Sequence, residues 1–509
     1  MWLLDRDRRF ALVLASVVVA VHLALAGRYG WFRDELYYVA CGERLAWGYV
    51  DHPPVVALVA RVARLIFGDS LVGLRTFAAL AGGGAIVLSG EIARAWGGGR
   101  VAQTIAPLAT AIAPYDLFVG QIYTMNAFEP LVWGAIALVV GRALRGDDPK
   151  PLVWLGPIVG IGILNKHSAA WPVAALAIAL ALSPSRRLLV RKQALLAAAI
   201  ATLIVAPHLV WQLQNGFPTR EFAHAALSGK NEPYGVLGLV GQQVQMLNPA
   251  LAPLWMVGLV ALLVSPALRR QRPMGVAYLL VAALVFATQA KAYYLVPAAS
   301  WLFAAGAIVV ERVTAARPRA RIAAALYGGL AVAAGVALAP TVIPILTVPS
   351  YQRYARALGA LGEAKTGEKN RPAALPQLYA DMHGWPEMAR VVESVVAGLS
   401  PEDCADTLIL AENYGEASAI EHFGRGLPPV ASGNTGWWLW GLPRPAPAVL
   451  VAVGNLDADV LEELFEDVKV MARIDHPLAR ASERDLPVYV CRRPRLPLAA
   501  AWPRMKHYR

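Results

Sequence analysis

Two neighbouring stretches near the start of the chain decide the fold. Residues 10–26 read F-A-L-V-L-A-S-V-V-V-A-V-H-L-A-L-A, and residues 31–54 read W-F-R-D-E-L-Y-Y-V-A-C-G-E-R-L-A-W-G-Y-V-D-H-P-P. The first stretch is apolar and has the length that a helix needs to cross the hydrocarbon layer of a membrane. The second holds adjacent carboxylates, paired tyrosines and an Asp-His-Pro-Pro turn. It is either a solvated loop or a site of chemistry, and the rest of the chain decides between these interpretations.

The composition predicts a polytopic α-helical membrane protein. The 509 residues are 57% hydrophobic and only 16% charged, whereas soluble domains carry about 25% charged residues. Apolar runs long enough to span a membrane recur as far as Leu346. The pattern predicts about 11 spans, and up to about 13, because short segments leave the count open by about two. The 11 runs cover residues 10–27, 71–93, 101–120, 126–143, 152–164, 168–182, 194–213, 250–268, 274–289, 294–311 and 322–346.

The basic residues predict the orientation of these spans. Lys and Arg cluster in every second connection, as at Arg94 and Arg100 after the second run and at Arg186 and Arg187 after the sixth. The positive-inside rule then places the N-terminus in the cytoplasm, with the protein in the inner (plasma) membrane. Because the net charge of +12 lies in these clusters, we expect no binding of nucleic acid.

The composition changes at Pro349, where charged residues become more frequent. We therefore predict a transmembrane domain at residues 1–348, with residues 28–70 as its first outer loop, and a small extracytoplasmic α/β domain at residues 349–509. Expected strands are 407–411, 448–453 and 487–491, and expected helices are 386–399, 414–423 and 458–470. Pairing of Cys404 with Cys491 in this domain is an open alternative.

Three carboxylates are candidates for acid–base chemistry. Asp34 and Glu35 follow the first span, where a carboxylate near a low-dielectric boundary can act as a general base toward an acceptor hydroxyl. Capping of a helix is the structural alternative for both residues. Glu129 lies several residues into an apolar helix, where an ionisable side chain is costly and is usually functional or paired.

Four other residues are weaker candidates for lining a cavity. Tyr37 lies at helical spacing from Asp34. His52 is in a rigid turn, and a lone histidine there more often binds nothing. Asp116 and His167 lie in other connections of the same predicted face. Capping explains Asp116 equally well.

Two lysines on the predicted outer face indicate a phosphate site. Lys166 lies between two short apolar segments, and Lys291 precedes Tyr293 and Tyr294. Cations beside aromatic hydroxyls suit an anionic headgroup or phosphate. Snorkelling lysines and an aromatic belt at the membrane surface are the structural alternatives.

Several motifs in order resemble a known family, the GT-C membrane glycosyltransferases. The resemblance is to bacterial proteins similar to dolichyl-phosphate-mannose protein mannosyltransferases and to the aminoarabinose transferase of lipid A. The motifs are R-D-E-L-Y-Y, G-Y-V-D-H-P-P, T-M-N-A-F-E-P-L-V-W, L-N-K-H-S-A, P-H-L-V-W-Q-L-Q-N-G-F-P-T-R-E-F, N-P-A-L-A-P-L-W, K-A-Y-Y-L-V-P-A and L-I-L-A-E-N-Y-G-E-A-S-A, between about residues 30 and 440.

This resemblance implies inverting transfer of a sugar from a polyprenyl phosphate to an acceptor hydroxyl on the extracytoplasmic side. Asp34 would be the base with Glu35 beside it, and Glu129 a further acidic residue of the site. Lys166, Lys291, Tyr293 and Tyr294 would hold the lipid phosphate, and His52 would line the cavity. The acceptor is a lipid, a glycan or a protein. A divalent metal is compatible with the acidic loop, but carboxylates alone do not specify one.

Two other function classes stay open from the sequence alone. A transporter or flippase of a polyprenyl-linked or anionic solute usually places charged groups near the membrane midplane, whereas here they gather at one face. An envelope scaffold would act through residues 349–509. No P-loop, GxGxxG, HExxH or GxSxG motif occurs in a suitable context.

Overall fold

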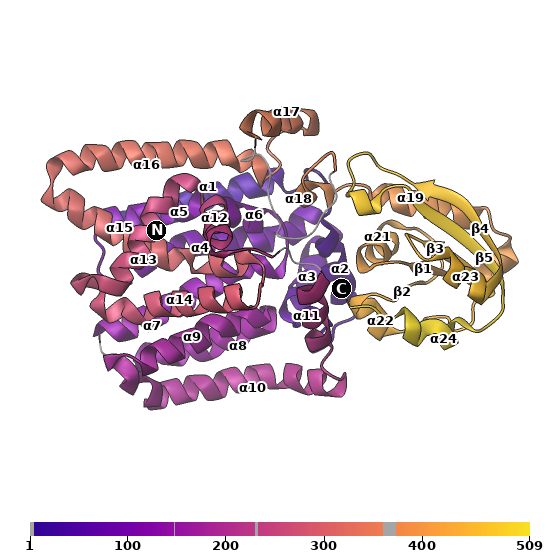
Figure 1. Ribbon diagram of the computed structural model, residues 1–509, viewed down its shortest axis with the longest axis horizontal. Coiled ribbons are helices and arrows are strands. Elements are labelled where there is room, and N and C mark those ends of the chain that lie inside the picture. Colours follow the sequence, from indigo (N-terminus) through magenta and orange to yellow (C-terminus); the bar gives the residue numbers. More distant parts are fainter. Residues whose placement is uncertain (1–4, 147, 230–232, 360–372, 509) are drawn as a thin grey trace. The chain divides into compact units, whose positions relative to one another are not determined.

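The computed structural model describes residues 5–146, 148–229, 233–359 and 373–508 (Figure 1). The chain divides into two compact units. The helical unit comprises Met1–Arg28, Ala63–Trp211 and Asn231–Glu363, and the mixed unit comprises Tyr29–Val62, Gln212–Lys230 and Ala364–Arg509. The predicted first outer loop is therefore split, and most of it groups with the C-terminal residues. A domain boundary near residue 349 stays a prediction.

The helical unit is built from apolar helices. They are α1 (Arg6–Leu25), α4 (Leu71–Ala95), α5 (Arg100–Ala111), α6 (Pro114–Gln121), α7 (Glu129–Gly146), α8 (Leu155–Asn165), α9 (Ala170–Ala181), α10 (Lys192–Gln214, which ends in the mixed unit), α12 (Val236–Met246), α13 (Ala252–Val264), α14 (Arg272–Ala287), α15 (Ala299–Ala316), α16 (Pro318–Leu338) and α17 (Val348–Leu358). Short 3-10 segments join several of them, including η1 (Met125–Phe128) and η7 (Ala292–Ala298). The core is aromatic and aliphatic, with Trp133 and Trp301 fully buried.

Several apolar helices of membrane-spanning length are confirmed, while the count of spans stays a prediction. Among the described residues, six helices are long and apolar enough to cross a membrane: Arg6–Leu25, Leu71–Ala95, Met125–Gly146, Lys192–Gln214, Ala292–Ala316 and Pro318–Thr341. A bent pair, Val236–Met246 with Pro249–Val264, would make a seventh. The fifth and sixth predicted spans lie on shorter apolar helices, and the third is interrupted between α5 and α6.

Glycines permit a close crossing of two helices in this unit, α13 and α15. A Cβ at Gly258 of α13 would lie 2.1 Å from the carbonyl oxygen of Leu302 on α15, and one at Gly306 would lie 2.2 Å from the carbonyl oxygen of Leu254. Only glycine lets these backbones approach so closely, as is common between membrane helices. The pair fixes α15, whose N-terminal end continues from η7.

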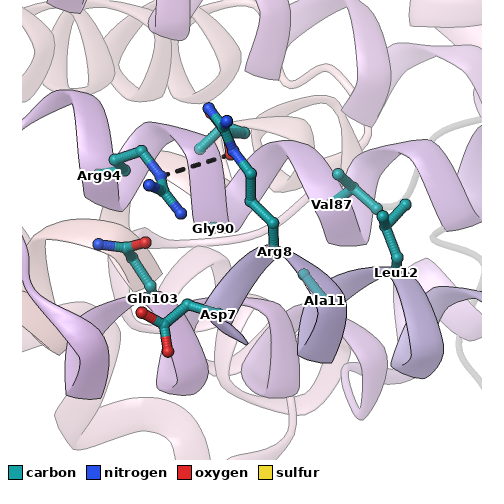
Figure 2. Close-up of a pocket in the computed structure, with 9 residues that line it drawn as sticks. Asp7, Arg8, Ala11, Leu12, Val87, Gly90, Arg94 and Gln103 are labelled. Carbon is teal, nitrogen blue, oxygen red and sulfur yellow. Dashed lines mark hydrogen bonds and ion pairs between the residues drawn. The ribbon is translucent and has the colours of Figure 1, made fainter. Parts of the chain in front are cut away.

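Basic side chains of three helices meet at one end of the helical unit. Arg8 donates to Glu91 (2.7 Å), and Arg142 lies 3.7 Å from the same carboxylate. Figure 2 shows Asp7, Arg8, Arg94 and Gln103 around a small pocket at this end. The start of α1 and the ends of α4 and α7 therefore lie together, as alternating membrane crossings require. Which side of the membrane they face stays a prediction.

The mixed unit contains a five-stranded sheet of order β2-β1-β3-β5-β4. The strands are β1 (Thr407–Ala411), β2 (Val430–Ser432), β3 (Val449–Val453), β4 (Phe465–Ile474) and β5 (Leu486–Pro494). β1 pairs in parallel with β2 and β3, and β5 pairs antiparallel with β3 and β4. The helices are α2 (Arg33–Glu43), α3 (Val55–Phe67, which ends in the helical unit), α11 (Pro218–Gly229), α18 (Gln377–Ala380), α19 (Trp385–Ala397), α20 (Pro401–Ala405), α21 (Tyr414–Phe423), α22 (Thr435–Trp440), α23 (Ala458–Leu464) and α24 (Leu498–Ala501).

Side chains alternate between the two faces of this sheet, and each face has its own core. Ile409 and Val451 pack with α19, α21 and α2 on one face. Leu408 and Leu450 pack with α23 and α24 on the other. The small α/β domain is thus confirmed, with helix α2 of the first loop as part of it. The predicted helix 458–470 is wrong after Leu464, because residues 465–474 form the edge strand β4, whose pairing with β5 overrides local helix propensity.

Candidate active site

A buried ion pair lies at the start of α7. Glu129 is 1% exposed and Lys166, just after α8, is 3% exposed. The Lys166 amine donates to Glu129 Oε2 (2.6 Å) and to Asn126 Oδ1 (2.7 Å), while the Ser168 hydroxyl donates to Glu129 Oε1 (2.5 Å). Both oxygens of the carboxylate are therefore used. The ionisable residue predicted in this apolar helix is paired, which removes most of the penalty for burying it.

Aromatic rings enclose this ion pair on another side. The Lys166 amine lies 4.1 Å from the centre of the Tyr294 ring and 5.1 Å from that of Tyr293. The Lys291 amine lies 5.8 Å from the same Tyr293 ring, and the two tyrosine rings stack at 4.9 Å. All four residues predicted to hold a phosphate thus converge in the helical unit. Lys166 is enclosed, whereas Lys291 is partly exposed.

The charged cluster of Figure 2 is remote from this group. Glu129 and Arg142 belong to the same helix and are separated by 13 residues, which corresponds to about 20 Å along the axis. Because Arg142 contacts the Arg8–Glu91 pair, the two clusters occupy opposite ends of the helical unit. Lys166 and its partners therefore lie at the end of the helical unit opposite the basic cluster, and the membrane side that this end faces stays a prediction.

The remaining candidates of the helical unit have different surroundings. Asp116 lies in the first turn of α6 and is partly buried, and the ring of the neighbouring Tyr115 stacks on Tyr293 at 6.4 Å. His167 follows Lys166 in the chain, but its Nε2 lies 2.9 Å from Nε2 of His208. Asp116 thus flanks the tyrosine group, while His167 has a histidine partner that the sequence did not single out. Roles in a cavity stay predictions for both.

The adjacent carboxylates of the first loop differ in exposure and in hydrogen-bond partners. Asp34 lies in the first turn of α2 with 31% of its side chain exposed, and its Oδ1 accepts a hydrogen bond from the Tyr414 hydroxyl (2.7 Å). Glu35 is fully buried, and its Oε2 accepts from the Phe32 backbone N–H (2.8 Å). Glu35 therefore caps its own helix, and of the two only Asp34 has a partly exposed carboxylate.

Tyr37 and His52 belong to the same loop as Asp34 and are buried in the mixed unit. The Tyr37 hydroxyl donates to Asp51 (3.0 Å) and accepts from the Gly436 N–H (3.1 Å). Burial raises the pKa of Asp51. The His52 ring is fully buried, stacks on Tyr49, and has a polar partner at each nitrogen: the Pro53 carbonyl and, at 3.6 Å, the Cys41 sulfur. Both residues pack as core residues here, and a part in lining a cavity stays a prediction.

Three partners of the site were not singled out from the sequence. Asn126, Ser168 and Tyr414 all stand within motifs that carried the resemblance, next to or near the residues that were chosen. Their proximity to chosen residues was a usable signal for Asn126 and Ser168. Tyr414 is 380 residues from Asp34, and only the folded unit reveals that contact.

Metal ligands and cysteine pairing were left open by the sequence. Within the described ranges, no three His, Cys, Asp or Glu side chains converge as metal ligands. We assign no step to a metal. Cys404 and Cys491 are both free thiols in the structure.

Comparisons with known proteins agree with the predicted resemblance. Residues 51–211 match the family described as dolichyl-phosphate-mannose-protein mannosyltransferase. The lipid A galacturonosyltransferase RgtD of Rhizobium johnstonii is 28% identical over 236 residues, so the match spans about half of each protein, 45% of this chain and 49% of RgtD. ArnT from Cupriavidus metallidurans bound to undecaprenyl phosphate has a TM-score of 0.60 at 17% identity, covering 94% of this chain and 97% of ArnT.

A third match extends over nearly the whole chain. The arabinofuranosyltransferase AftD from Mycobacteria has a TM-score of 0.54 at 15% identity, covering 96% of this chain and 40% of AftD. The resemblance to GT-C membrane glycosyltransferases is therefore confirmed: residues 51–211 match the mannosyltransferase family, and the chain as a whole has the fold of ArnT.

Proposed function

We propose that this protein transfers a sugar from a polyprenyl-phosphate donor to an acceptor hydroxyl, with inversion at the anomeric carbon, on the extracytoplasmic face of the inner membrane. One observation carries the proposal. The fold of a protein crystallised with undecaprenyl phosphate extends over 94% of this chain, and the chain places two lysines and two tyrosines together at one end of that fold. These groups suit a lipid-linked phosphate.

Asp34 is the general base in this proposal. Its carboxylate takes the proton of the acceptor hydroxyl while the acceptor oxygen forms a bond to the anomeric carbon. The bond from that carbon to the phosphate oxygen breaks in the same displacement, and the polyprenyl phosphate leaves. Attack on the face opposite the leaving group inverts the configuration. A single positioned base is enough, because a phosphate whose charge is neutralised leaves readily.

The Lys291 amine and the Tyr293 and Tyr294 hydroxyls take the departing phosphate. Lys166 lies behind these rings and is held by Glu129. In this proposal Glu129 is a positioning residue: it holds the Lys166 amine against the Tyr294 ring, so the aromatic pair has a fixed face for the phosphate. Lys166 adds positive electrostatic potential at the phosphate from the far side of the tyrosine rings, and it makes no direct contact with the phosphate in this proposal.

An apolar cavity of about 350 Å³ suits part of the prenyl chain. It lies between α5, α13, α15 and α16, and its lining includes Leu108, Leu254, Val257 and Val310. Such a lining favours a hydrocarbon over a polar solute. The cavity supports a lipid-linked donor over the transport of a soluble anion, as does the gathering of charged residues at the ends of the helical unit.

The relatives suggest donor and acceptor classes to test first. RgtD is named as a lipid A galacturonosyltransferase. We therefore propose a uronic acid or a hexose on undecaprenyl phosphate as the donor and a lipid-anchored glycan such as lipid A as the acceptor.

Lipid-linked sugars in a strain that lacks the gene test this function. We expect one polyprenyl-phosphate sugar to accumulate and one sugar to disappear from an envelope glycan or lipid, both measured by mass spectrometry. Wild-type protein should restore both, and Asp34→Asn should restore neither. Asp69→Asn is the matched control, because this carboxylate is 63% exposed and forms a surface ion pair with Arg64. Unchanged lipid-linked sugars and envelope glycans would contradict the proposal.

A further inference from the structure

One side chain of the α/β domain contacts the candidate base Asp34 directly. In open sheets with parallel strands, ligands usually bind outside the carboxyl ends of the strands, where neighbouring connections diverge. Here β1 runs in parallel between β2 and β3, and α21 begins directly after β1. The first residue of α21 is Tyr414. Helix α2 of the first loop contacts this position.

The backbone at Tyr414 is held firmly. Asn413 caps α21, because its Oδ1 accepts from the N–H groups of Gly415 (2.9 Å) and Glu416 (3.1 Å). The Tyr414 N–H in turn donates to Asn434 Oδ1 (3.2 Å). The hydroxyl of Tyr414 therefore projects from a fixed point of the domain.

The ring of Tyr414 is packed as tightly as its backbone. The Arg33 guanidinium lies over it at 5.1 Å, and the Tyr37 ring lies 4.9 Å away. A Cβ at Gly415 would lie 2.6 Å from the Arg33 side chain, so glycine is what permits this approach. The Tyr414 hydroxyl donates to Asp34 Oδ1 at 2.7 Å, a distance typical of a strong hydrogen bond to a carboxylate.

Two features make this bond directional. Burial raises the pKa of Tyr414 well above its ordinary value, so the hydroxyl stays protonated and donates at neutral pH. Asp34 Oδ1 also has the Arg33 Nε 3.7 Å away. Among the described residues, no hydrogen bond is made to Asp34 Oδ2. One oxygen is therefore fixed and the other is left for a substrate.

We propose that Tyr414 is a positioning residue for the reaction: its hydroxyl fixes Asp34 Oδ1 so that Oδ2 faces the acceptor hydroxyl. This inference rests on the proposed function. It gives the C-terminal domain a part in the chemistry, because a side chain of that domain orients the base. Removing the hydroxyl should leave donor binding intact and misalign proton transfer.

A double-mutant cycle with Tyr414→Phe tests the proposal. The variant loses the hydroxyl and keeps the ring that packs on Arg33. With undecaprenyl-phosphate galacturonic acid as donor and lipid A as acceptor, we expect kcat to fall roughly 10- to 100-fold and KM for the donor to change less than about twofold. In the Asp34→Asn background, the same substitution should change the residual rate less than about twofold, because no base is left to align.

Tyr49→Phe is the matched control for a purely structural effect. It also removes a buried hydroxyl of the mixed unit, which donates to the Cys41 carbonyl oxygen (2.9 Å) and does not touch Asp34. We expect it to lower thermal stability and to have the same effect on the rate with Asp34 or Asn at position 34. An equal loss from Tyr414→Phe in both backgrounds would overturn the proposal.

Carbodiimide labelling of Asp34, read by mass spectrometry, tests the contact without any transfer assay. Tyr414→Phe should label severalfold faster at Asp34 than the wild type, with Asp69 as the internal reference. Equal labelling would overturn the proposal. If the wild type transfers no sugar from any donor, the proposed function fails instead, and the labelling still decides whether the Tyr414 hydroxyl holds Asp34.

Discussion

The Glu129–Lys166 pair makes a quantitative prediction about stability. The two side chains are 2% and 4% exposed and their charged atoms are 2.6 Å apart. Removing one member of such a pair leaves a buried charge without its counter-ion, which costs about 3–5 kcal/mol. Glu129→Gln keeps the shape but leaves the Lys166 charge uncompensated, and Lys166→Met leaves the Glu129 charge. We expect each to lower the free energy of unfolding of the helical unit by about 3 kcal/mol.

The double variant distinguishes this explanation from a general packing defect. In Glu129→Gln with Lys166→Met no buried charge remains, so we expect its loss to be smaller than the sum of the single losses by at least about 1.5 kcal/mol. Unfolding by increasing amounts of a denaturing detergent in mixed micelles, followed by tryptophan fluorescence, gives the free energies of unfolding of the wild type, the two single variants and the double variant. Asp69→Asn is the control, with a loss below about 0.5 kcal/mol. Additive losses, or single losses under about 1 kcal/mol, would refute the reasoning.

Two further predictions concern packing and pH. Gly258→Ala places a Cβ 2.1 Å from the Leu302 carbonyl oxygen and should lower the free energy of unfolding by about 1–3 kcal/mol. In the control Gly328→Ala, on α16, the new Cβ has nothing within 4 Å, and this variant should be neutral or stabilising. Thermal unfolding in micelles measures both effects. Burial and the neighbouring Glu483 raise the pKa of Glu416 well above its ordinary value. The folded state then holds a proton that the unfolded state releases. The contribution of Glu416 to the stability of the mixed unit should therefore be fully present below about pH 4.5. It should be lost as pH rises through the raised pKa, by up to about 1.4 kcal/mol per pH unit. Glu416→Gln should flatten this dependence between pH 5 and 8, and an unchanged slope would contradict the assignment.

Much of the fold follows from local patterns in the sequence. Apolar length predicted the helices that become α1, α4 and α10, and alternating signals predicted β1 and β3. The edge strand β4 was missed because Phe465 to Val470 lies next to a helical pattern, and its conformation depends on pairing with β5. Local propensity carries no information about such a partner.

Part of the candidate site could likewise be predicted from the sequence, and part could not. An ionisable Glu129 in an apolar helix and two lysines beside aromatic residues pointed to one functional group, and the structure brings these residues together in the helical unit. Composition could not tell Asp34 from Glu35, because only the fold shows that one is exposed and the other caps a helix. The Tyr414 contact depends on a fold that joins two ends of the chain, which no spacing rule reaches.

The anomeric configuration of the product tests the central claim most directly. Purified protein in lipid nanodiscs would be supplied with an α-linked undecaprenyl-phosphate sugar and lipid A, and the new glycosidic bond would be assigned by NMR. Direct displacement with Asp34 as the base predicts a β-linked product together with stoichiometric release of undecaprenyl phosphate, and loss of both in Asp34→Asn. An α-linked product, or full transfer by Asp34→Asn, would contradict the account.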